Sequence, residues 1–434
     1  MIIKFGKLSL ITINSIPFVE ILLLIYISSV IIFSMIPVGN IVSKLIGLIL
    51  IYVFVIITFI GNKKIVLSRE IKIVAVWLIF CIISAIVATN INLVFLRIST
   101  LLQLSVFFIA GYSIIVKGKL SIKSILYSFV LSVFIIYVYG FINQYDPSVL
   151  VTKNRITATV GDPNILSVYG AFAFIISLFL LKVENSRIGK LFIIIIMGLI
   201  LCGVVLTQSR QGILISIIGL TIYILIQVLY KFINANNRIE YALKLLLYLV
   251  LFVTSFAIII YLFKTSEYSY RFQALAAFIK LNFTSSNDLM TRIIDYSAYE
   301  RKQLIRYAIQ VWFDNPVFGV GLDNFKVILK QYNPLGPRLY AHNNYLELLA
   351  TIGTIGAIIY YSIYASIILR LFHLQKILKT SSIELKMIHL FLTILFSLMV
   401  LELFTVTYYT KFTWIFLLII VGYADRIVFD KVIN

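Results

Sequence analysis

The stretch Tyr340-Ala341-His342-Asn343-Asn344-Tyr345-Leu346-Glu347 decides how the chain is interpreted, because it joins a long polar segment to a hydrophobic one. Residues 264–340 are the long polar segment, and residues 343–369 are apolar enough to cross a bilayer. His342 is one of 3 histidines in 434 residues. An imidazole at the edge of a membrane helix is a candidate for chemistry, since it exchanges a proton near neutral pH.

The composition places the whole chain in a membrane. Of its residues, 62% are hydrophobic and 12% are charged, whereas soluble domains carry roughly 45–50% apolar and about 25% charged residues. Apolar runs near the ~20 residues of a spanning helix occur at about 16–36, 41–60, 71–89, 93–115, 122–142, 164–181, 190–206, 211–230, 243–263, 343–369, 387–407 and 412–428. The sequence therefore predicts an all-α, polytopic transmembrane bundle of about twelve spans. Residues 1–263 hold spans one to nine, residues 264–340 a large helical loop, and residues 341–434 the last three spans.

The basic residues indicate the orientation of the bundle. The chain has 37 Lys and Arg against 17 Asp and Glu, a net charge of +20. Short cytoplasmic loops of membrane proteins are rich in Lys and Arg, and here such clusters recur in alternate connections, as at Lys4 and Lys7, Lys63 and Lys64, and Lys117. This pattern predicts cytoplasmic termini and an outer location for residues 264–340. The positive charge then reflects topology, so we expect no nucleic-acid partner.

The long loop contains an amphipathic helix that carries arginines. Apolar residues recur after Arg301 with helical spacing, at Leu304, Ile305, Ala308, Ile309 and Trp312. Arg301 lies on this apolar stripe, whereas Lys302 and Arg306 fall off it. A second interpretation is that Arg301 only snorkels or pairs with an acid.

A turn and a short helix follow. Pro316 ends the amphipathic helix, and Gly319 and Gly321 permit a tight turn, which is a more ordinary role than phosphate binding. Asp323 is expected to cap a short helix reaching about Gln331. Among the charges within spans, Arg97 is the deepest and is expected to face the bundle interior.

Three outer positions are candidates for one site. The N-terminal turn of a helix favours a neutral imidazole at His342, although His342 could instead serve only as a cap. Glu347 is placed to orient His342 or to act as a rival base. Arg210, in the short connection 207–212, is either an interfacial anchor or a partner of Arg301 in binding an anionic lipid headgroup, because guanidinium groups match phosphate oxygens.

These motifs together resemble the bacterial O-antigen ligase and O-antigen polymerase superfamily. The resemblance covers residues 200–360 and rests on Thr207-Gln208-Ser209-Arg210-Gln211-Gly212, Arg301, Asp314-Asn315-Pro316-Val317-Phe318-Gly319-Val320-Gly321, Asn324-Phe325, His342-Asn343-Asn344-Tyr345-Leu346-Glu347 and Gly353. Gly161-Asp162-Pro163-Asn164 is similar to a further outer-loop motif. Ile305 replaces the aromatic residue usual in the family, which leaves the choice between Arg301 and Arg306 open.

The resemblance implies a GT-C-like membrane glycosyltransferase of surface polysaccharide synthesis. It implies an inverting, metal-independent transfer on the outer face of the plasma membrane, from a glycan on undecaprenyl pyrophosphate to a sugar hydroxyl, with no cofactor. His342 would be the base, and Arg210 and Arg301 would stabilise the pyrophosphate. Further substrate contacts would be Arg155, Arg338, Arg306, Asn343 and Glu347. A chain-length regulator protein is a further expected partner.

Three functions fit these features. A repeat-unit polymerase is slightly favoured, and a ligase acting on a lipid core or another acceptor is the alternative. A lipid-linked-sugar flippase or transporter would require repeated halves and polar groups at the midplane of the bilayer. The ionisable residues singled out as site candidates, Arg210, Arg301 and His342, instead lie at the outer edge.

Overall fold

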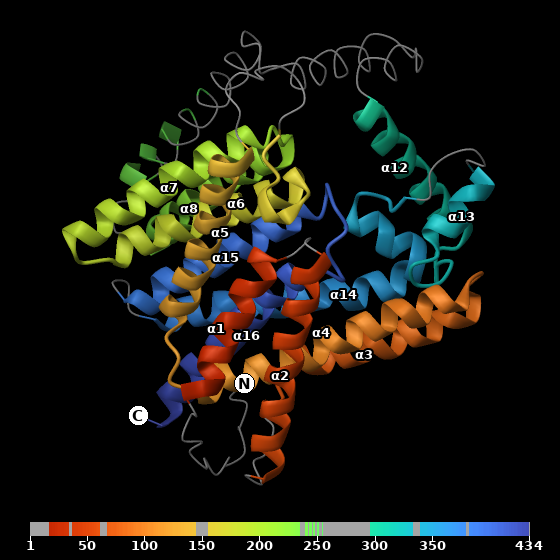
Figure 1. The fold of residues 1–434 in the computed structure, drawn as a ribbon, viewed down its shortest axis with the longest axis horizontal. Coiled ribbons are helices and arrows are strands. Elements are labelled where there is room, and N and C mark those ends of the chain that lie inside the picture. The colour runs from red at the N-terminus through yellow and green to blue at the C-terminus, as the bar shows by residue number, and fades with distance from the viewer. Residues whose placement is uncertain are drawn as a thin grey trace.

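The computed structural model describes residues 17–33, 37–60, 67–144, 155–234, 296–332, 339–378 and 382–433, with a few positions between 239 and 254. These residues are helical, with short connections and no strand among them (Figure 1). The helices are α1 (Pro17–Ile32), α2 (Pro37–Ile60), α3 (Arg69–Ile83), η1 (Ser84–Val87), α4 (Ile91–Lys117), α5 (Ile122–Gln144), η2 (Ala158–Val160), α6 (Pro163–Val183), α7 (Arg187–Leu206), α8 (Arg210–Asn234), α12 (Tyr296–Asp314), α13 (Phe325–Tyr332), α14 (Asn344–Ile377), α15 (Ile383–Leu401) and α16 (Lys411–Ile433).

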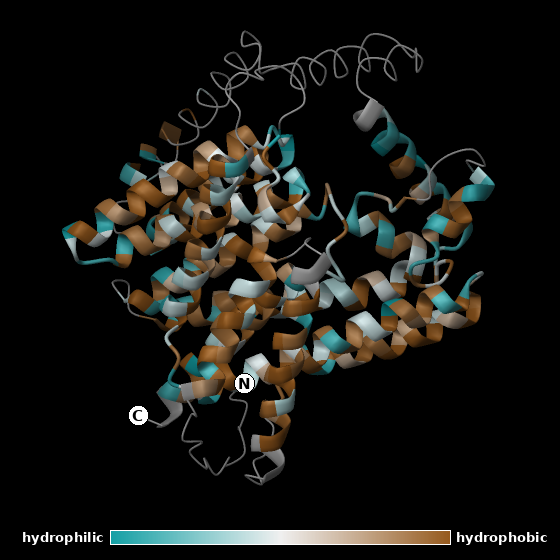
Figure 2. Ribbon diagram, viewed as in Figure 1, coloured by the Kyte–Doolittle hydropathy of each residue, from teal (hydrophilic) through white to brown (hydrophobic). Residues whose placement is uncertain are grey.

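The protein is a polytopic helical membrane protein. Within the described residues, 9 helices are long and apolar enough to cross a membrane, and α1 and α2 contribute two shorter apolar stretches. Figure 2 shows the hydrophobic residues along these helices, with hydrophilic residues gathered on α12 and α13. The expected span at 243–263 lies mainly outside the described residues, as does the part of the expected loop from 264 to 295.

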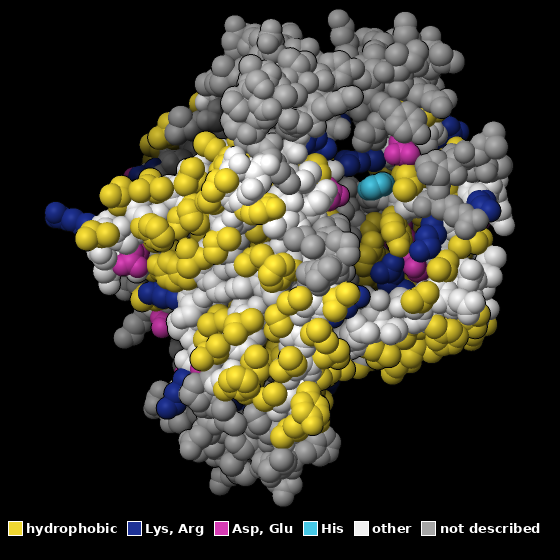
Figure 3. Space-filling model, viewed as in Figure 1, with side chains coloured by type: hydrophobic (Ala, Val, Ile, Leu, Met, Phe, Trp, Pro, Cys, Tyr) yellow, Lys and Arg dark blue, Asp and Glu magenta, His cyan; other side chains and the backbone are white. Residues whose placement is uncertain are grey.

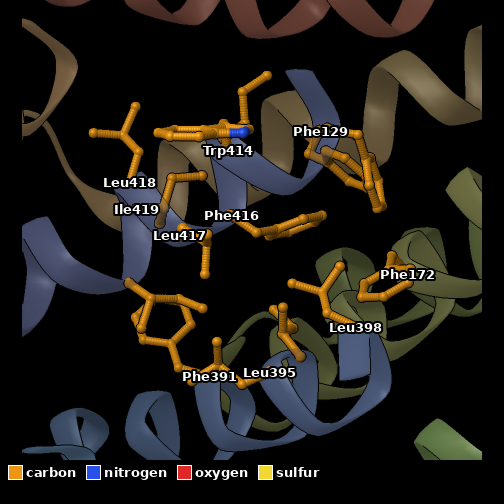
Figure 4. Packing of buried hydrophobic residues seen from close by; sticks show 14 of the residues in the cluster. Phe129, Phe172, Phe391, Leu395, Leu398, Trp414, Phe416, Leu417, Leu418 and Ile419 are labelled. Carbon is orange, nitrogen blue, oxygen red and sulfur yellow. The ribbon is translucent and has the colours of Figure 1, made fainter. Parts of the chain in front are cut away.

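Aromatic packing around α16 forms the centre of the bundle. The ring of Phe416 lies 5.2 Å from that of Phe129 on α5 and 5.4 Å from that of Phe172 on α6, measured between centroids. Figure 4 shows Phe416 among these rings and the leucines of α15. Trp414, on the same helix, meets Phe108 of α4 edge to face at 5.9 Å. Interlocked rings bury much apolar area, so α16 fixes α4, α5, α6 and α15 around one core.

Helix α14 is broken at Gly353. This residue has φ +66°, in the left-handed region that an α-helix does not use. The segment after α12 binds the exposed backbone there: Val320 and Gly321 donate to the carbonyls of Ala350 and Thr351 at 3.0 and 2.8 Å. In return, the N–H of Thr354 donates to the carbonyl of Pro316 at 2.8 Å. The segment after α12 therefore docks directly onto a spanning helix.

The tight turn expected at Gly319 and Gly321 is confirmed, with φ of +67° and +95°. A Cβ on Gly319 would lie 2.5 Å from the carbonyl of Thr351. Glycine is needed here for its backbone angle and for close approach to α14.

The capping role expected for Asp323 is wrong. Its carboxylate instead accepts bonds from Arg97 at 3.1 Å and Lys326 at 3.0 Å, and Asn324 is the residue that precedes α13. The physical reason is charge: a carboxylate between two cations is better stabilised by them than by a single backbone N–H. Arg97 faces the protein interior, as expected.

The break in α14 can be tested with Gly353→Ala. A Cβ at this position would lie 2.2 Å from the carbonyl oxygen of Val317. The backbone conformation of Gly353, φ +66° with ψ −175°, also costs a non-glycine residue about 1–3 kcal/mol. We expect the variant to unfold at a clearly lower temperature in detergent. The control is Gly198→Ala in α7, where a Cβ meets nothing within 4 Å and alanine is favoured by about 0.5–1 kcal/mol. Equal stability of Gly353→Ala and wild type would show that α14 is not broken there.

Candidate functional site

The start of α6 and the turn between α7 and α8 are joined by a hydrogen-bonded cluster. The Arg155 guanidinium donates to the carbonyl of Thr207 at 2.8 Å and to the side-chain oxygen of Asn164 at 3.1 Å. The hydroxyl of Ser209 donates to the same Asn164 oxygen at 3.1 Å. Arg210 follows Ser209 directly and begins α8, half-buried. The structure therefore brings Arg155 and Arg210, two predicted site residues, to one place.

Asp162 turns the chain into α6. Gly161 before it has φ +72°, the Asp162 carboxylate accepts the N–H of Asn164 at 2.7 Å, and Pro163 occupies the first helical turn. Its negative charge raises the pKa of His342. Asp162 at the start of α6 is therefore within electrostatic reach of His342.

His342 sits in a strained turn that is held on both sides. It has φ +51°, which is uncommon for a residue with a side chain. Before it, the N–H of Ala341 donates to the carboxylate of Glu347 at 2.8 Å. After it, Asn343 caps α14 by accepting from Leu346 at 3.0 Å. The imidazole of His342 is half-buried. The backbone on either side of His342 is fixed by the hydrogen bonds of Ala341 and Asn343.

Asn344 and Glu402 hold the start of α14 against the α15–α16 connection. The N–H of Asn344 donates to the carbonyl of Glu402 at 2.7 Å, and its side-chain oxygen accepts from Thr407 at 2.9 Å. The fully buried Glu402 carboxylate accepts the hydroxyls of Tyr364 at 2.7 Å and Tyr361 at 3.0 Å. A buried carboxylate must be bonded in this way to be tolerated, so the network fixes one geometry.

Arg301 reaches the same region from α12. Leu304, Ala308 and Val311 are the buried residues of this helix, with 4%, 0% and 0% exposure. Arg301 continues that line toward the start of the helix and is half-buried, whereas Arg306 is exposed. The Arg301 charge lowers the pKa of His342. Arg301 thus lies toward the buried side of α12 and Arg306 on its exposed side, and the catalytic role of either arginine stays a prediction.

His342 is held as a neutral base. Burial lowers the pKa of its imidazole below the ordinary 6.5, the Arg301 charge lowers it further, and the Asp162 charge partly opposes both. At pH 7 the imidazole is therefore neutral and can accept a proton.

Residues with strained backbone angles lie in the connections that carry the candidate site. The non-glycine residues with positive φ in the described parts of the chain are Ala158, Gln208, Asp323 and His342. All four lie in the connections discussed above, around the starts of α6, α8, α13 and α14. Strained residues of this kind gather at functional sites, where the surrounding structure maintains them.

The remaining predicted residues have different positions. Glu347 is fully buried with its carboxylate on the Ala341 N–H, and Asn343 is 9% exposed with its side chain in the helix cap. Arg338 lies outside the described residues. The substrate contacts assigned to these residues and to Arg155 and Arg306 stay predictions.

A known protein family matches this part of the chain. Residues 195–361 fit the family model described as O-antigen ligase, and the match includes Arg210, Arg301 and His342. This region is therefore similar to the O-antigen ligase family. The resemblance to the O-antigen ligase and polymerase superfamily is thereby confirmed. No curated protein matches the chain.

Two residues around this region, Asp162 and Glu402, were not predicted as site residues from the sequence. A Gly-Asp-Pro sequence is a strong signal for a capped helix beside a turn, and it points to Asp162. Glu402 gave little signal, because its partners Asn344, Tyr361 and Tyr364 are distant in sequence. Among the described residues, no group of three His, Cys, Asp or Glu side chains is arranged to hold a metal.

The effect of the neighbouring charges on the pKa of His342 can be measured by NMR titration of its imidazole. The signal of His342 is identified as the one lost in His342→Gln. We expect a midpoint below 6.5 in the wild type. Arg301→Met should raise the midpoint, because it removes a positive charge that opposes protonation, and Asp162→Asn should lower it. Lys302→Met is the matched control on the exposed side of α12. A midpoint that does not respond to Arg301→Met would separate Arg301 from His342.

Proposed function

We propose that this protein, like the O-antigen ligase family that it resembles, is a membrane glycosyltransferase that transfers a glycan from undecaprenyl pyrophosphate to a sugar hydroxyl, with inversion and without a metal. The observation that carries the proposal is the half-buried imidazole of His342 in a strained turn before α14, where burial and the charge of Arg301 both lower its pKa. A neutral base next to a guanidinium suits a reaction that removes a proton and releases an anionic leaving group.

In the proposed reaction, the acceptor hydroxyl attacks the anomeric carbon from the side opposite the pyrophosphate. The new C–O bond forms as the bond to the pyrophosphate oxygen breaks, and His342 takes the hydroxyl proton. Arg301 and Arg210 stabilise the leaving pyrophosphate, with charged hydrogen bonds worth roughly 1.5–3 kcal/mol each. Arg155 bonds the carbonyl of Thr207 and shares the Asn164 oxygen with Ser209, the residue before Arg210. We propose that it assists in binding the pyrophosphate.

The distribution of basic residues supports an outer location for this site. Lys117, Lys182 and Lys231 occupy the last turns of α4, α6 and α8, whereas Arg210 is at the first residue of α8. Basic residues in short connections mark the cytoplasmic side. We therefore propose that the site faces outward from the plasma membrane and that both termini are cytoplasmic.

The acceptor separates two versions of the function. A polymerase uses a second lipid-linked repeat unit, and a ligase uses a different acceptor such as a lipid core. We favour the polymerase, and the family description favours the ligase. Purified protein incubated with a lipid-linked repeat unit alone, with and without chelator, tests both: a ladder of products indicates a polymerase, and a requirement for a second acceptor indicates a ligase. Loss of activity in chelator that divalent ions restore would contradict the metal-independent reaction.

His342→Ala is expected to lower the rate of glycan transfer by about 10²–10⁴, the usual contribution of a general base. Expression and the level of lipid-linked donor should stay at wild-type values. His373→Ala is the matched control, because His373 is exposed near the far end of the same helix. Wild-type transfer by His342→Ala would remove His342 as the base.

Arg210→Lys is expected to reduce transfer at least tenfold although it keeps the positive charge, because lysine lacks the planar fork that binds two phosphate oxygens. The same change at Arg187, exposed at the start of α7, should leave transfer unaltered. Full activity of Arg210→Lys would favour a simple interfacial anchor.

A further inference from the structure

A second polar cluster, formed by Arg97, Asp323, Lys326, Tyr340 and Tyr409, lies next to His342 and takes no part in the reaction described above. The Arg97 guanidinium donates to the Tyr340 hydroxyl at 2.7 Å and lies 3.8 Å from the centre of the Tyr409 ring. The Lys326 ammonium lies 3.4 Å from the same hydroxyl. We call this group the Arg97 cluster. It draws on α4, α13, the approach to α14 and the α15–α16 connection.

The accessible part of the Arg97 cluster is positively charged. Arg97 and Lys326 expose 13% and 22% of their side chains and share the carboxylate of Asp323, which exposes 5%. Glu347 is the other acidic group within electrostatic reach. It is fully buried, and its carboxylate bonds the N–H of Ala341 instead of either cation. Two cations thus face the surface with one carboxylate between them.

The Arg97 cluster is built from other residues than the arginines proposed for the pyrophosphate, and Tyr340 joins it to the turn of His342. Tyr340 precedes His342 by two residues, and its hydroxyl bonds Arg97 and Lys326. Figure 3 shows basic side chains at the border of a hollow on this face, together with acidic and apolar side chains. A second cationic group, separate from Arg210 and Arg301, is available for a part of the substrate other than the pyrophosphate.

The cluster also has the chemistry of a sugar site. Tyr340 and Tyr409 are half-buried, with ring centres 5.8 Å apart. The electron-rich face of such a ring attracts the C–H groups of a pyranose. Guanidinium and ammonium groups bind carboxylates through charge-assisted hydrogen bonds, which are about twice as strong as neutral ones. Rings combined with a few converging charged groups are typical of sites that orient small polar ligands.

We propose that the Arg97 cluster binds an acidic sugar residue, one bearing a carboxylate, of the acceptor glycan. The sugar ring would pack on Tyr340, and its carboxylate would meet Lys326 and the open side of Arg97. This assignment rests on the proposed function, because the role of acceptor follows from the role of His342. It makes a repeat unit that contains a uronic acid the preferred substrate class.

The test measures equilibrium binding to the full-length protein in lipid nanodiscs, using three probes. They are a trisaccharide of galacturonic acid, the neutral trisaccharide of galactose, and inorganic pyrophosphate. The key variant is Lys326→Met, which keeps the Arg97–Asp323 ion pair intact. Its matched control is Lys330→Met, which removes the same charge from the exposed side of α13.

The proposal predicts that wild type binds the acidic trisaccharide at least tenfold more tightly than the neutral one. Lys326→Met should lose most of that preference, Lys330→Met should keep it, and pyrophosphate affinity should be equal in all three proteins. The proposal is wrong if wild type does not prefer the acidic trisaccharide, or if pyrophosphate affinity falls in Lys326→Met. It is also wrong if Lys326→Met lowers the unfolding temperature while the preference persists, because the cluster would then only clamp α13.

Binding and transfer can fail separately. His342→Ala should bind the acidic trisaccharide as wild type does, since His342 is outside the Arg97 cluster. If binding of the acidic trisaccharide depends on Lys326 but the protein has no transfer activity, the proposed reaction is contradicted and the sugar site is supported. If the protein transfers glycan but binding does not depend on Lys326, the sugar site is contradicted and the proposed reaction is supported.

Discussion

Backbone N–H and C=O groups find no water inside a bilayer, so a spanning helix can be interrupted only where other protein groups bond its backbone. In α14 that interruption is at Gly353, and the turn from Pro316 to Gly321 supplies the bonds. Because the turn follows α12 directly, α12 is placed against α14. The indole of Trp312 adds a bond to the Thr354 hydroxyl at 3.0 Å. One backbone requirement thus determines where Arg301 stands relative to His342.

The proposed role of His342 as a base depends on this placement. Burial alone would give a weak base, and the positive charge of Arg301 weakens it further by favouring the neutral imidazole. Asp162 opposes both effects from the start of α6. An imidazole that is neutral at pH 7 but still able to accept a proton is suited to remove the proton of a hydroxyl. Neither α12 nor α6 could set this balance alone.

Sequence patterns predicted most of the fold and part of the site. Hydropathy and helix length identify the spans, because each must bury its own backbone and present apolar side chains. The apolar stripe of α12 and the glycine turn at 319–321 were likewise visible in local spacing. The break at Gly353 and the Glu402 network were not, because their partners are brought together only by packing. Asp323 was misjudged for the same reason: Arg97, its partner on α4, is distant in sequence.

Helix α14 is held at both ends as well as at its break. Near its far end, Arg370 is bonded to Asp425 of α16 and lies 3.4 Å from Glu70 of α3, and the hydroxyl of Ser366 donates to Glu70 at 2.8 Å. At its start, Asn344 is tied to the α15–α16 connection. A transporter needs helices that rock past each other around a central site. A helix tied at its start, its break and its far end instead keeps His342 in one place. A fixed His342 agrees with the proposed reaction, in which catalysis depends on positioning and preorganised charge.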